Sequence, residues 1–212
     1  MLEDDVYKTI TDLSEGNYTE RRSRFIAYAI PVQNEEEIKE ILDEYKREYY
    51  NARHVCYAYM LGHEREDFRA NDDGEPSGTA GRPILGQINS NELTDILIIV
   101  VRYYGGIKLG TGGLIVAYRT AAAAAIEGAN IIKKTVDEQI SFTFEYPFLN
   151  DVMRIVKEEE PDIVDQHFEM DCTMTLQIRR SRMERLKNRL SIVETLAFPS
   201  VEESDEESIS ED

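Results

Sequence analysis

The sequence predicts an α+β protein of two domains with an acidic tail, from three observations. Apolar segments with strand character alternate with amphipathic helical segments along most of the chain. The composition changes after Asn130, which places a domain boundary near residues 133–137. The last eleven residues contain seven carboxylates and no basic residue. We therefore expect domains at residues 1–134 and 135–200, and a tail at residues 201–212.

The composition favours a soluble globular protein over a membrane-spanning or disulfide-stabilised one. Of 212 residues, 42% are apolar and 31% are charged, and no apolar run is long enough to cross a bilayer. The first residues are acidic and lack the features of a signal peptide. Cys56 and Cys172 alone form neither a disulfide framework nor a metal-binding motif. We expect a cytoplasmic protein that has no membrane segment.

The net charge of −18 limits the choice of partners. An acidic protein is repelled by a polyphosphate at long range, so nucleic-acid binding would need a local basic patch. Without its seven carboxylates from Glu202 to Asp212, the chain still carries −11. The tail is most simply a disordered, solubilising end, and it could instead shield a basic surface.

Two strands are expected at the N-terminus, near Val6–Ile10 and Phe25–Val32. The turn between them contains Gly16 and the charged run from Glu20 to Arg24. This run is either a solvated hairpin end or a phosphate contact.

Asn34, followed by three glutamates, begins a helix, because its side chain can cap free N–H groups. An apolar stripe at helical spacing indicates that the helix covers one face of a sheet. The stripe consists of Ile38, Ile41, Leu42, Tyr45 and Tyr49.

The segment His54–Leu61 is expected to be an interior strand, because it is almost continuously apolar. His54 stands at its start, where it is either a packed histidine or an acid–base group. The polar residues 62–70 are expected to form a loop.

Three carboxylates, Asp72, Asp73 and Glu75, crowd around Gly74 in a loop at residues 71–86. They could hold a cation, act as an acid–base pair, or simply form a turn, and the spacing excludes an EF-hand. Small and hydroxyl residues then follow and could contact an anionic or polar partner through exposed N–H groups. These are Ser77, Gly78, Thr79 and Gly81.

A strand at Leu93–Tyr104, a glycine-rich loop and an alanine-rich helix from Leu114 to Ile126 make a candidate anion site. Unpaired N–H groups point outward at a helix N-terminus, and Arg102 and Lys108 add positive charge. The alternative is that the glycines serve only tight turns and close packing. The loop residues of this site are Gly105, Gly106, Gly110, Thr111, Gly112 and Gly113.

The second half is expected to be a ferredoxin-like domain, because its elements follow the order βαββαβ. We expect strands at 140–146, 163–168 and 172–179, helices at 148–160 and 181–190, and a final strand before Pro199. This domain also holds a basic patch, which is either a solvated face or a contact with phosphate or an acidic partner. The patch consists of Arg179, Arg180, Arg182, Arg185, Lys187 and Arg189.

Four ordered blocks resemble the signature of the IMPACT family, whose bacterial members are called YigZ-like. They are R-S-R-F-I-A (22–27), A-R-H-V-C-Y-A-Y (52–59), D-D-G-E-P-S-G-T-A-G-R-P-I-L-G (72–86) and R-Y-Y-G-G-I-K-L-G-T-G-G-L-I-V-A-Y (102–118). The resemblance implies a first domain similar to the second domain of a small-subunit ribosomal protein. It implies a second domain similar to the fifth domain of elongation factor G, and eukaryotic relatives are tied to control of translation initiation. Relatives often carry a histidine where this chain has Tyr49, which weakens any proposal that needs a histidine pair.

Three functions remain open at this point. The first is a translation-associated regulator that contacts RNA or a ribosome-bound partner without catalysis. The second is an enzyme that acts on a small phosphorylated or anionic substrate at the glycine loops, with His54, Asp72, Asp73 and Glu75 as its reactive groups. The third is a protein–protein interaction module. None of them calls for a cofactor or a metal ion.

Overall fold

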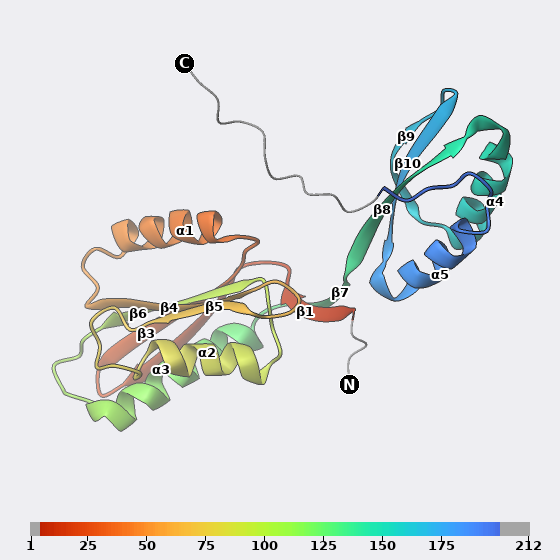
Figure 1. Cartoon of the computed structure of the whole chain (residues 1–212). Coiled ribbons are helices and arrows are strands. Elements are labelled where there is room, and N and C mark those ends of the chain that lie inside the picture. The colour runs from red at the N-terminus through yellow and green to blue at the C-terminus, as the bar shows by residue number, and fades with distance from the viewer. Residues whose placement is uncertain (1–4, 200–212) are drawn as a thin grey trace, which may run out of the picture. The chain divides into compact units, whose positions relative to one another are not determined.

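The computed structural model describes residues 5–199, and the predicted acidic tail lies outside the described residues. The chain divides into two compact units, and the boundary falls between Lys134 and Thr135. The fold is α+β in both units (Figure 1). Among the helices of residues 5–199, none is long and apolar enough to cross a membrane.

The N-terminal unit is a five-stranded antiparallel sheet between two layers of helices. Helix α1 covers one face, and helices α2 and α3 cover the other (Figure 1). The strand order is β2-β3-β6-β4-β5. The strands are β2 (Ser14–Glu20), β3 (Ser23–Pro31), β4 (His54–Leu61), β5 (Asp67–Asn71) and β6 (Ile96–Tyr103), and the helices are α1 (Glu35–Glu48), α2 (Gly81–Ser90) and α3 (Gly110–Glu127). A separate two-stranded sheet pairs β1 (Val6–Ile10) with β7 (Ile131–Thr135).

Strand β6 forms the centre of the sheet because its side chains are apolar on both faces. Ile98 and Val100 pack under α2 and α3, whereas Leu97 and Ile99 pack under α1. Such continuous apolar character is typical of a strand that is covered on both sides. The predicted strand at Leu93–Tyr104 is confirmed, with bounds Ile96–Tyr103.

The predicted cap and stripe of α1 are confirmed. The backbone N–H of Glu37 donates to the Asn34 side chain at 2.9 Å, which satisfies a free donor at the helix start. Ile38 and Leu42 are buried on the sheet. Tyr49 lies in the same layer, where its hydroxyl contacts that of Tyr28, so it is part of the α1 core.

Among the strands and α-helices of residues 5–199, four were not predicted, β2, β5, α2 and β7, and β7 spans the start of the boundary expected at residues 133–137. Strand β2 occupies the turn expected around Gly16, and β5 occupies part of the loop expected at residues 62–70. Both are edge strands, and their mostly exposed, polar residues give no apolar alternation. Helix α2 (Gly81–Ser90) begins inside the loop expected at residues 71–86 and extends beyond it, although it contains Pro83 and Gly86. The proline is tolerated because it stands in the first turn, where no N–H partner is lost.

The C-terminal unit is a three-stranded antiparallel sheet of order β8-β10-β9, with α4 and α5 packed on one face (Figure 1). Its elements are β8 (Asp137–Glu145), α4 (Leu149–Glu159), β9 (Asp162–His167), β10 (Asp171–Arg179) and α5 (Arg180–Leu190). The expected final strand is wrong, because within residues 5–199 a single isolated bridge joins Ala197 to Thr143. The described part of this unit is therefore βαββα.

Candidate anion-binding site

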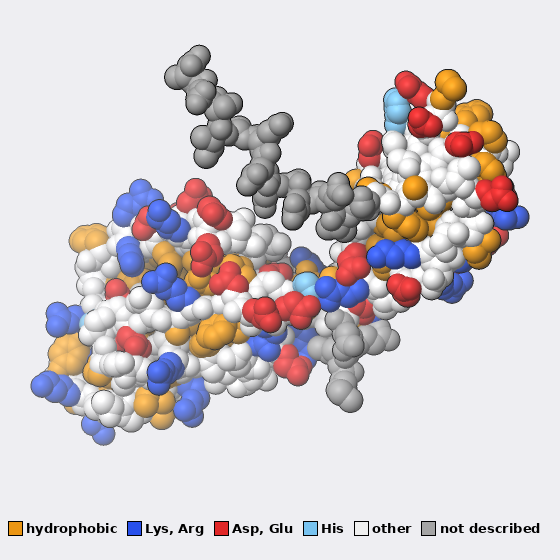
Figure 2. Space-filling view, viewed as in Figure 1, with side chains coloured by type: hydrophobic (Ala, Val, Ile, Leu, Met, Phe, Trp, Pro, Cys, Tyr) orange, Lys and Arg blue, Asp and Glu red, His pale blue; other side chains and the backbone are white. Residues whose placement is uncertain are grey.

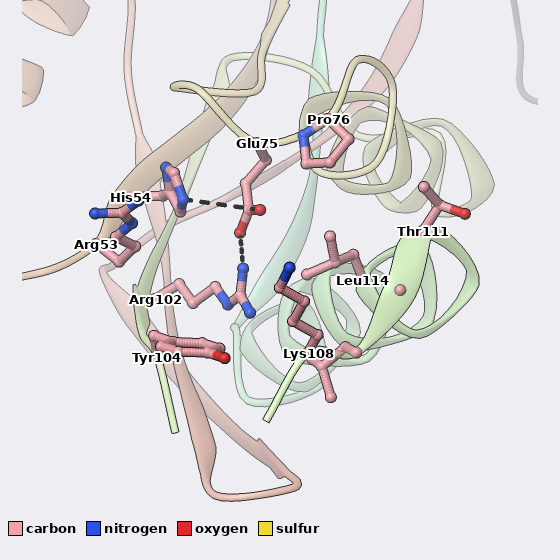
Figure 3. Close-up of a pocket in the computed structure, with 11 residues that line it drawn as sticks. Arg53, His54, Glu75, Pro76, Arg102, Tyr104, Lys108, Thr111 and Leu114 are labelled. Carbon is pink, nitrogen blue, oxygen red and sulfur yellow. Dashed lines mark hydrogen bonds and ion pairs between the residues drawn. The ribbon is translucent and has the colours of Figure 1, made fainter. Parts of the chain in front are cut away.

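A pocket of about 630 Å³ opens at the end of the N-terminal sheet, where β4 begins and β6 ends (Figure 3). Both glycine loops reach it, since Pro76 comes from the first loop and Gly110 from the second. Its lining consists of Arg53, His54, Glu75, Pro76, Arg102, Tyr104, Lys108, Leu109, Gly110, Thr111 and Leu114. The two loops predicted to flank one site therefore do so.

Sheet register places Arg102 at the wall of this pocket. Arg102 pairs with His54 of β4 on one side and with Phe25 of β3 on the other, so the three lie in one row across the sheet. Only 6% of Arg102 is exposed. Its guanidinium carbon lies 5.6 Å from the centre of the Phe25 ring and 5.7 Å from that of Tyr104, within the range of cation–π attraction. The aromatic rings hold this cation in a fixed position.

Glu75 is the buried partner of Arg102. Its Oε1 accepts from Arg102 Nη1 (Figure 3). The same oxygen accepts from the Tyr118 hydroxyl at 2.8 Å. The Sγ of Cys56 lies 3.3 Å from the same hydroxyl. Burial raises the pKa of the Tyr118 hydroxyl and of the Cys56 thiol, so both stay protonated and neutral. Glu75 is therefore held by neighbouring donors inside the protein.

The ring of His54 is fixed between two acceptors. Its Nδ1 lies 2.6 Å from the carbonyl oxygen of Asp73, and because a carbonyl only accepts, Nδ1 carries a proton. Its Nε2 lies 3.8 Å from Oε2 of Glu75, at the pocket wall (Figure 3). His54 is thus positioned at the pocket by a backbone contact.

The second glycine loop adds a lysine and a helix N-terminus. The side chain of Lys108 points into the pocket (Figure 3). Helix α3 begins at Gly110 without a side-chain cap, so among the described residues no side chain accepts the N–H groups of its first turn. Such a helix end attracts anions through these N–H groups and through the helix dipole.

The glycines of the second loop have different roles. Gly110 lines the pocket, whereas Gly105, Gly106, Gly112 and Gly113 do not. A Cβ on Gly105 would lie 2.0 Å from the carbonyl carbon of Arg22, and its N–H donates to Ser23 Oγ at 3.1 Å. The loop thus packs directly against the end of the β2–β3 hairpin, and only glycine permits this approach.

Asp72 and Asp73 do not line the pocket, and their hydrogen bonds fit the turn-forming role, one of the three alternatives that the sequence left open. The Asp72 carboxylate accepts the backbone N–H groups of Gly78, Ala80 and Gly81 at 2.8–2.9 Å. Partial burial acts to raise its pKa, but these three donors outweigh burial and lower it. Asp73 Oδ2 accepts the N–H of Val55 at 2.7 Å. Within residues 5–199, no cluster of three or more His, Cys, Asp or Glu side chains could hold a metal ion.

The first loop therefore offers fewer free N–H groups than its small residues suggest. The N–H groups of Gly78 and Gly81 are bound by Asp72, and Thr79 is buried with its hydroxyl donating to the Pro76 carbonyl. Ser77 is exposed and does not line the pocket. Gly74 has a φ of +83° and lies beside the His54 ring, so it shapes the loop around the histidine.

Several lining residues were missed at the sequence level. Arg53 directly precedes β4, and Tyr104 directly follows β6, and neither position carries a motif of its own. Leu109 and Leu114 look like ordinary core residues of α3. Only the pairing of β4 with β6 brings Arg53 and Tyr104 to one pocket.

The basic patch predicted on the C-terminal unit surrounds a fully buried carboxylate, Glu159 of α4. Arg185 and Arg189 lie 3.0 and 2.6 Å from Glu159 Oε1, and Arg182 lies 3.7 Å from Oε2. The hydrogen bond from Arg189 is the main cause that lowers the pKa of Glu159. In addition, Arg180 pairs with Glu138 at 2.7 Å. Much of the positive charge of this patch is therefore compensated within the unit.

Comparison with known proteins gives consistent matches. The model of the Impact N-terminal domain matches residues 21–126. The chain is 33% identical over 162 residues to the IMPACT family member YvyE of Bacillus subtilis (strain 168), covering 76% of this chain and 75% of that protein. It is 29% identical over 173 residues to YigZ of Escherichia coli (strain K12), covering 81% and 85%.

A crystal structure of a protein described as hypothetical covers 94% of this chain and 99% of its own, with 26% identity and a TM-score of 0.70. The likeness thus extends over both units. Together with the four sequence blocks around the pocket, these matches show that the chain belongs to the IMPACT family, as a bacterial member of the YigZ and YvyE type.

Proposed function

We propose that this protein is a cytoplasmic, translation-associated regulator that binds RNA through one basic end of its N-terminal unit, without catalysis of its own. A ribosome-bound protein partner is the other outcome that the binding experiments below can reveal. The observation that carries the proposal is the gathering of cations from four separate segments at one end of the N-terminal sheet, where Arg53, Arg102 and Lys108 line the pocket. We call this surface the basic end, and it consists of Arg21, Arg22, Arg24, Arg53, Arg102 and Lys108.

The contacts that join these segments are backbone contacts. Arg24 pairs with Tyr103 across β3 and β6, and Arg53 N–H donates to the carbonyl of Arg102 at 2.9 Å. Arg21 and Arg22 form the hairpin turn against which Gly105 packs. In Figure 2, Lys and Arg side chains gather at the end of the N-terminal unit where the loop between β6 and α3 lies. The run from Glu20 to Arg24 is thus part of a larger cationic surface.

A localised basic end suits RNA binding by an acidic protein. With a net charge of −18, the rest of the surface repels a polyphosphate, so binding depends on a local cluster of cations. The exposed ring of Tyr104 beside the pocket could also stack on a base. Support for a role without catalysis comes from the carboxylates, because Asp72, Asp73 and Glu75 are all engaged by donors of the protein itself.

The finer assignment of the two units is part of this proposal. We propose that the N-terminal unit is similar to the second domain of a small-subunit ribosomal protein, as the family resemblance implies. We propose that the C-terminal unit is a reduced ferredoxin-like domain similar to the fifth domain of elongation factor G. The order β8-β10-β9, with Ala197 bridged to the outer side of β8, supports the second assignment.

The test is equilibrium binding of a labelled single-stranded RNA at several salt concentrations. We expect Arg24→Gln and Lys108→Gln each to weaken binding about threefold to tenfold and to reduce the salt slope by roughly 0.7–1, because each removes one phosphate contact. Lys46→Gln, which removes an exposed cation from α1, is the matched control and should change neither quantity. If Arg24→Gln and Lys108→Gln bound RNA as tightly as wild type and Lys46→Gln do, the basic end would be ruled out as the RNA contact.

The patch of the C-terminal unit remains a proposed second contact. Its test needs neutral variants, because Arg182→Glu with Arg185→Glu would place two carboxylates beside buried Glu159 and disturb folding. Arg185 is the most exposed arginine of this group, with 70% of its side chain accessible. We expect Arg185→Gln to weaken RNA binding less than Lys108→Gln does.

An enzymatic function is the second candidate, and the pair of His54 and Glu75 at the pocket wall is the observation that favours it. A thermal-shift screen with small phosphorylated compounds separates the two candidates. A stabilisation that is lost in His54→Ala, together with turnover of the stabilising compound, would favour the enzyme. A protein-binding module would show neither this shift nor RNA binding.

A further inference from the structure

The pocket combines a charge excess with depth, and these two properties restrict which phosphate group it can take. Three cations line it, Arg53, Arg102 and Lys108, against one carboxylate, Glu75. They leave a formal excess of two positive charges before the N-terminus of α3 is considered. A phosphomonoester carries close to two negative charges at neutral pH, whereas a phosphodiester inside a strand carries one.

The deepest of these cations is also incompletely satisfied. The Arg102 side chain is only 7% exposed, and its Nη1 is engaged by Glu75. Its Nε is buried and has no hydrogen-bond partner within residues 5–199. A guanidinium has five N–H donors, and leaving such donors unpaired in a buried position is costly. Because Arg102 lines the pocket, an anion that enters it would bring an acceptor next to this guanidinium.

Depth favours a group that projects from the end of a ligand. A phosphodiester within a strand carries a sugar on both sides, which hinders its approach to a side chain that lies below the surface. A terminal phosphate carries only one substituent and can reach Arg102 while the rest of the ligand remains nearer the opening.

The remaining walls suit the sugar and base of one nucleotide. Pro76, Leu109, Leu114 and the ring of Tyr104 present apolar surface around the cations (Figure 3). The volume of about 630 Å³ lies within the range of sites for organic ligands and exceeds what an inorganic anion needs.

We propose that this pocket binds the terminal phosphomonoester of a nucleotide, with the phosphate between Lys108, Arg102 and the first N–H groups of α3. The nucleotide can be the end of an RNA chain or a free mononucleotide, since both present the same group. The idea that the phosphate belongs to the end of an RNA chain rests on the proposed function, whereas the binding of a phosphomonoester in this pocket does not.

The experiment compares one labelled RNA decamer in three forms, with a 5′-phosphate, with a 3′-phosphate and with hydroxyl groups at both ends. All are titrated with the full chain at one salt concentration. We expect at least one phosphorylated form to bind about tenfold more tightly than the hydroxyl form, because a charge-assisted contact with two cations is gained. This preference should vanish in Lys108→Gln and persist in Lys46→Gln.

A direct titration with uridine monophosphate and with uridine, on wild type and on Lys108→Gln, identifies the source of the phosphate. If the monophosphate binds at the pocket and no decamer binds, the inference stands and the RNA-binding proposal fails. If all three decamers bind equally and Lys108→Gln weakens them equally, the RNA-binding proposal stands and this inference is overturned. If neither the decamers nor the monophosphate binds, both are overturned.

Discussion

Asp72 stabilises the start of α2 from outside the helix. Ala80, the residue before the helix, has no side chain that could cap it, and the carboxylate of Asp72 accepts the N–H groups of Ala80 and Gly81 instead. A negative charge near the N-terminus of a helix is also favoured by the helix dipole. The residue that looked like a candidate acid therefore has a structural role, and its position explains why the first glycine loop has a defined shape.

We expect Asp72→Asn to lower the free energy of unfolding at pH 7 by about 1–3 kcal/mol, the range for hydrogen bonds to a charged group. The pKa of Asp72 is lower in the folded protein than its ordinary value of 3.8, so the ionised form is favoured by folding. Its contribution is therefore complete above about pH 4 and is lost as the pH falls through the folded pKa.

Urea denaturation of both proteins at pH 7 and near pH 3 measures this difference. The difference in free energy of unfolding between wild type and Asp72→Asn should be smaller at the lower pH. Asp43→Asn, at an exposed position of α1, serves as the control and should have little effect at either pH. A gap of the same size at both pH values would show that the charge of Asp72 does not cap α2.

Among the candidate residues, the sequence placed Arg102, Lys108, Gly110 and Thr111 at one site, and the structure brings them together with His54 and Glu75. A strand, a loop and a helix that follow one another fix the first group locally. The Asp72 carboxylate binds N–H groups of its own loop, whereas the Glu75 carboxylate meets Arg102 of the distant strand β6. Residue type and spacing could not distinguish these two.

Close contact between β2 and α3 shows how one element depends on another. Gly16 of β2 lies against the helix, and a Cβ at this position would be 2.3 Å from the backbone nitrogen of Ala125. Ala121, Ala122 and Ala125 are fully buried on this side of α3. Small residues on both elements permit the close approach, and they explain why an edge strand of polar residues contains a glycine.

We expect Gly16→Ala to destabilise the protein by about 1–3 kcal/mol or somewhat more, because the helix must move away from the sheet. Thermal or urea unfolding followed by circular dichroism measures the loss. Gly86→Ala is the matched control, since a Cβ at Gly86 meets nothing within 4 Å and alanine is the better helix former. This variant should be neutral or more stable by up to about 1 kcal/mol. Equal stability of Gly16→Ala and wild type would contradict the packing of β2 on α3.

At the level of elements, long apolar segments were predictable and edge elements were not. Strands β3, β4 and β6 and helices α1 and α3 follow from their apolar periodicity. Strand β2 is stabilised by pairing with β3 across a turn of two exposed arginines, and β5 by pairing with β4 across the short loop at residues 62–66. The last expected strand, before Pro199, has strand-like residues but pairs at only one position in the described chain.

At the scale of the whole molecule, charge is distributed unevenly. Basic residues gather at one end of the N-terminal unit, while the arginines of α5 are compensated by Glu158 and Glu159. The second basic patch was the more conspicuous in the sequence, because its six cations lie within the eleven residues 179–189. The basic end is dispersed over four segments, so only the fold reveals it.

Hydrogen–deuterium exchange of the full chain, with and without a single-stranded RNA, tests the central claim most directly. It reports every backbone segment at once, and slowed exchange marks amides that bind or become covered. We predict protection at residues 21–24, 53–54 and 105–112, and none in α1. Protection confined to α4 and α5, or no change anywhere at saturating RNA, would contradict the assignment of RNA binding to the basic end.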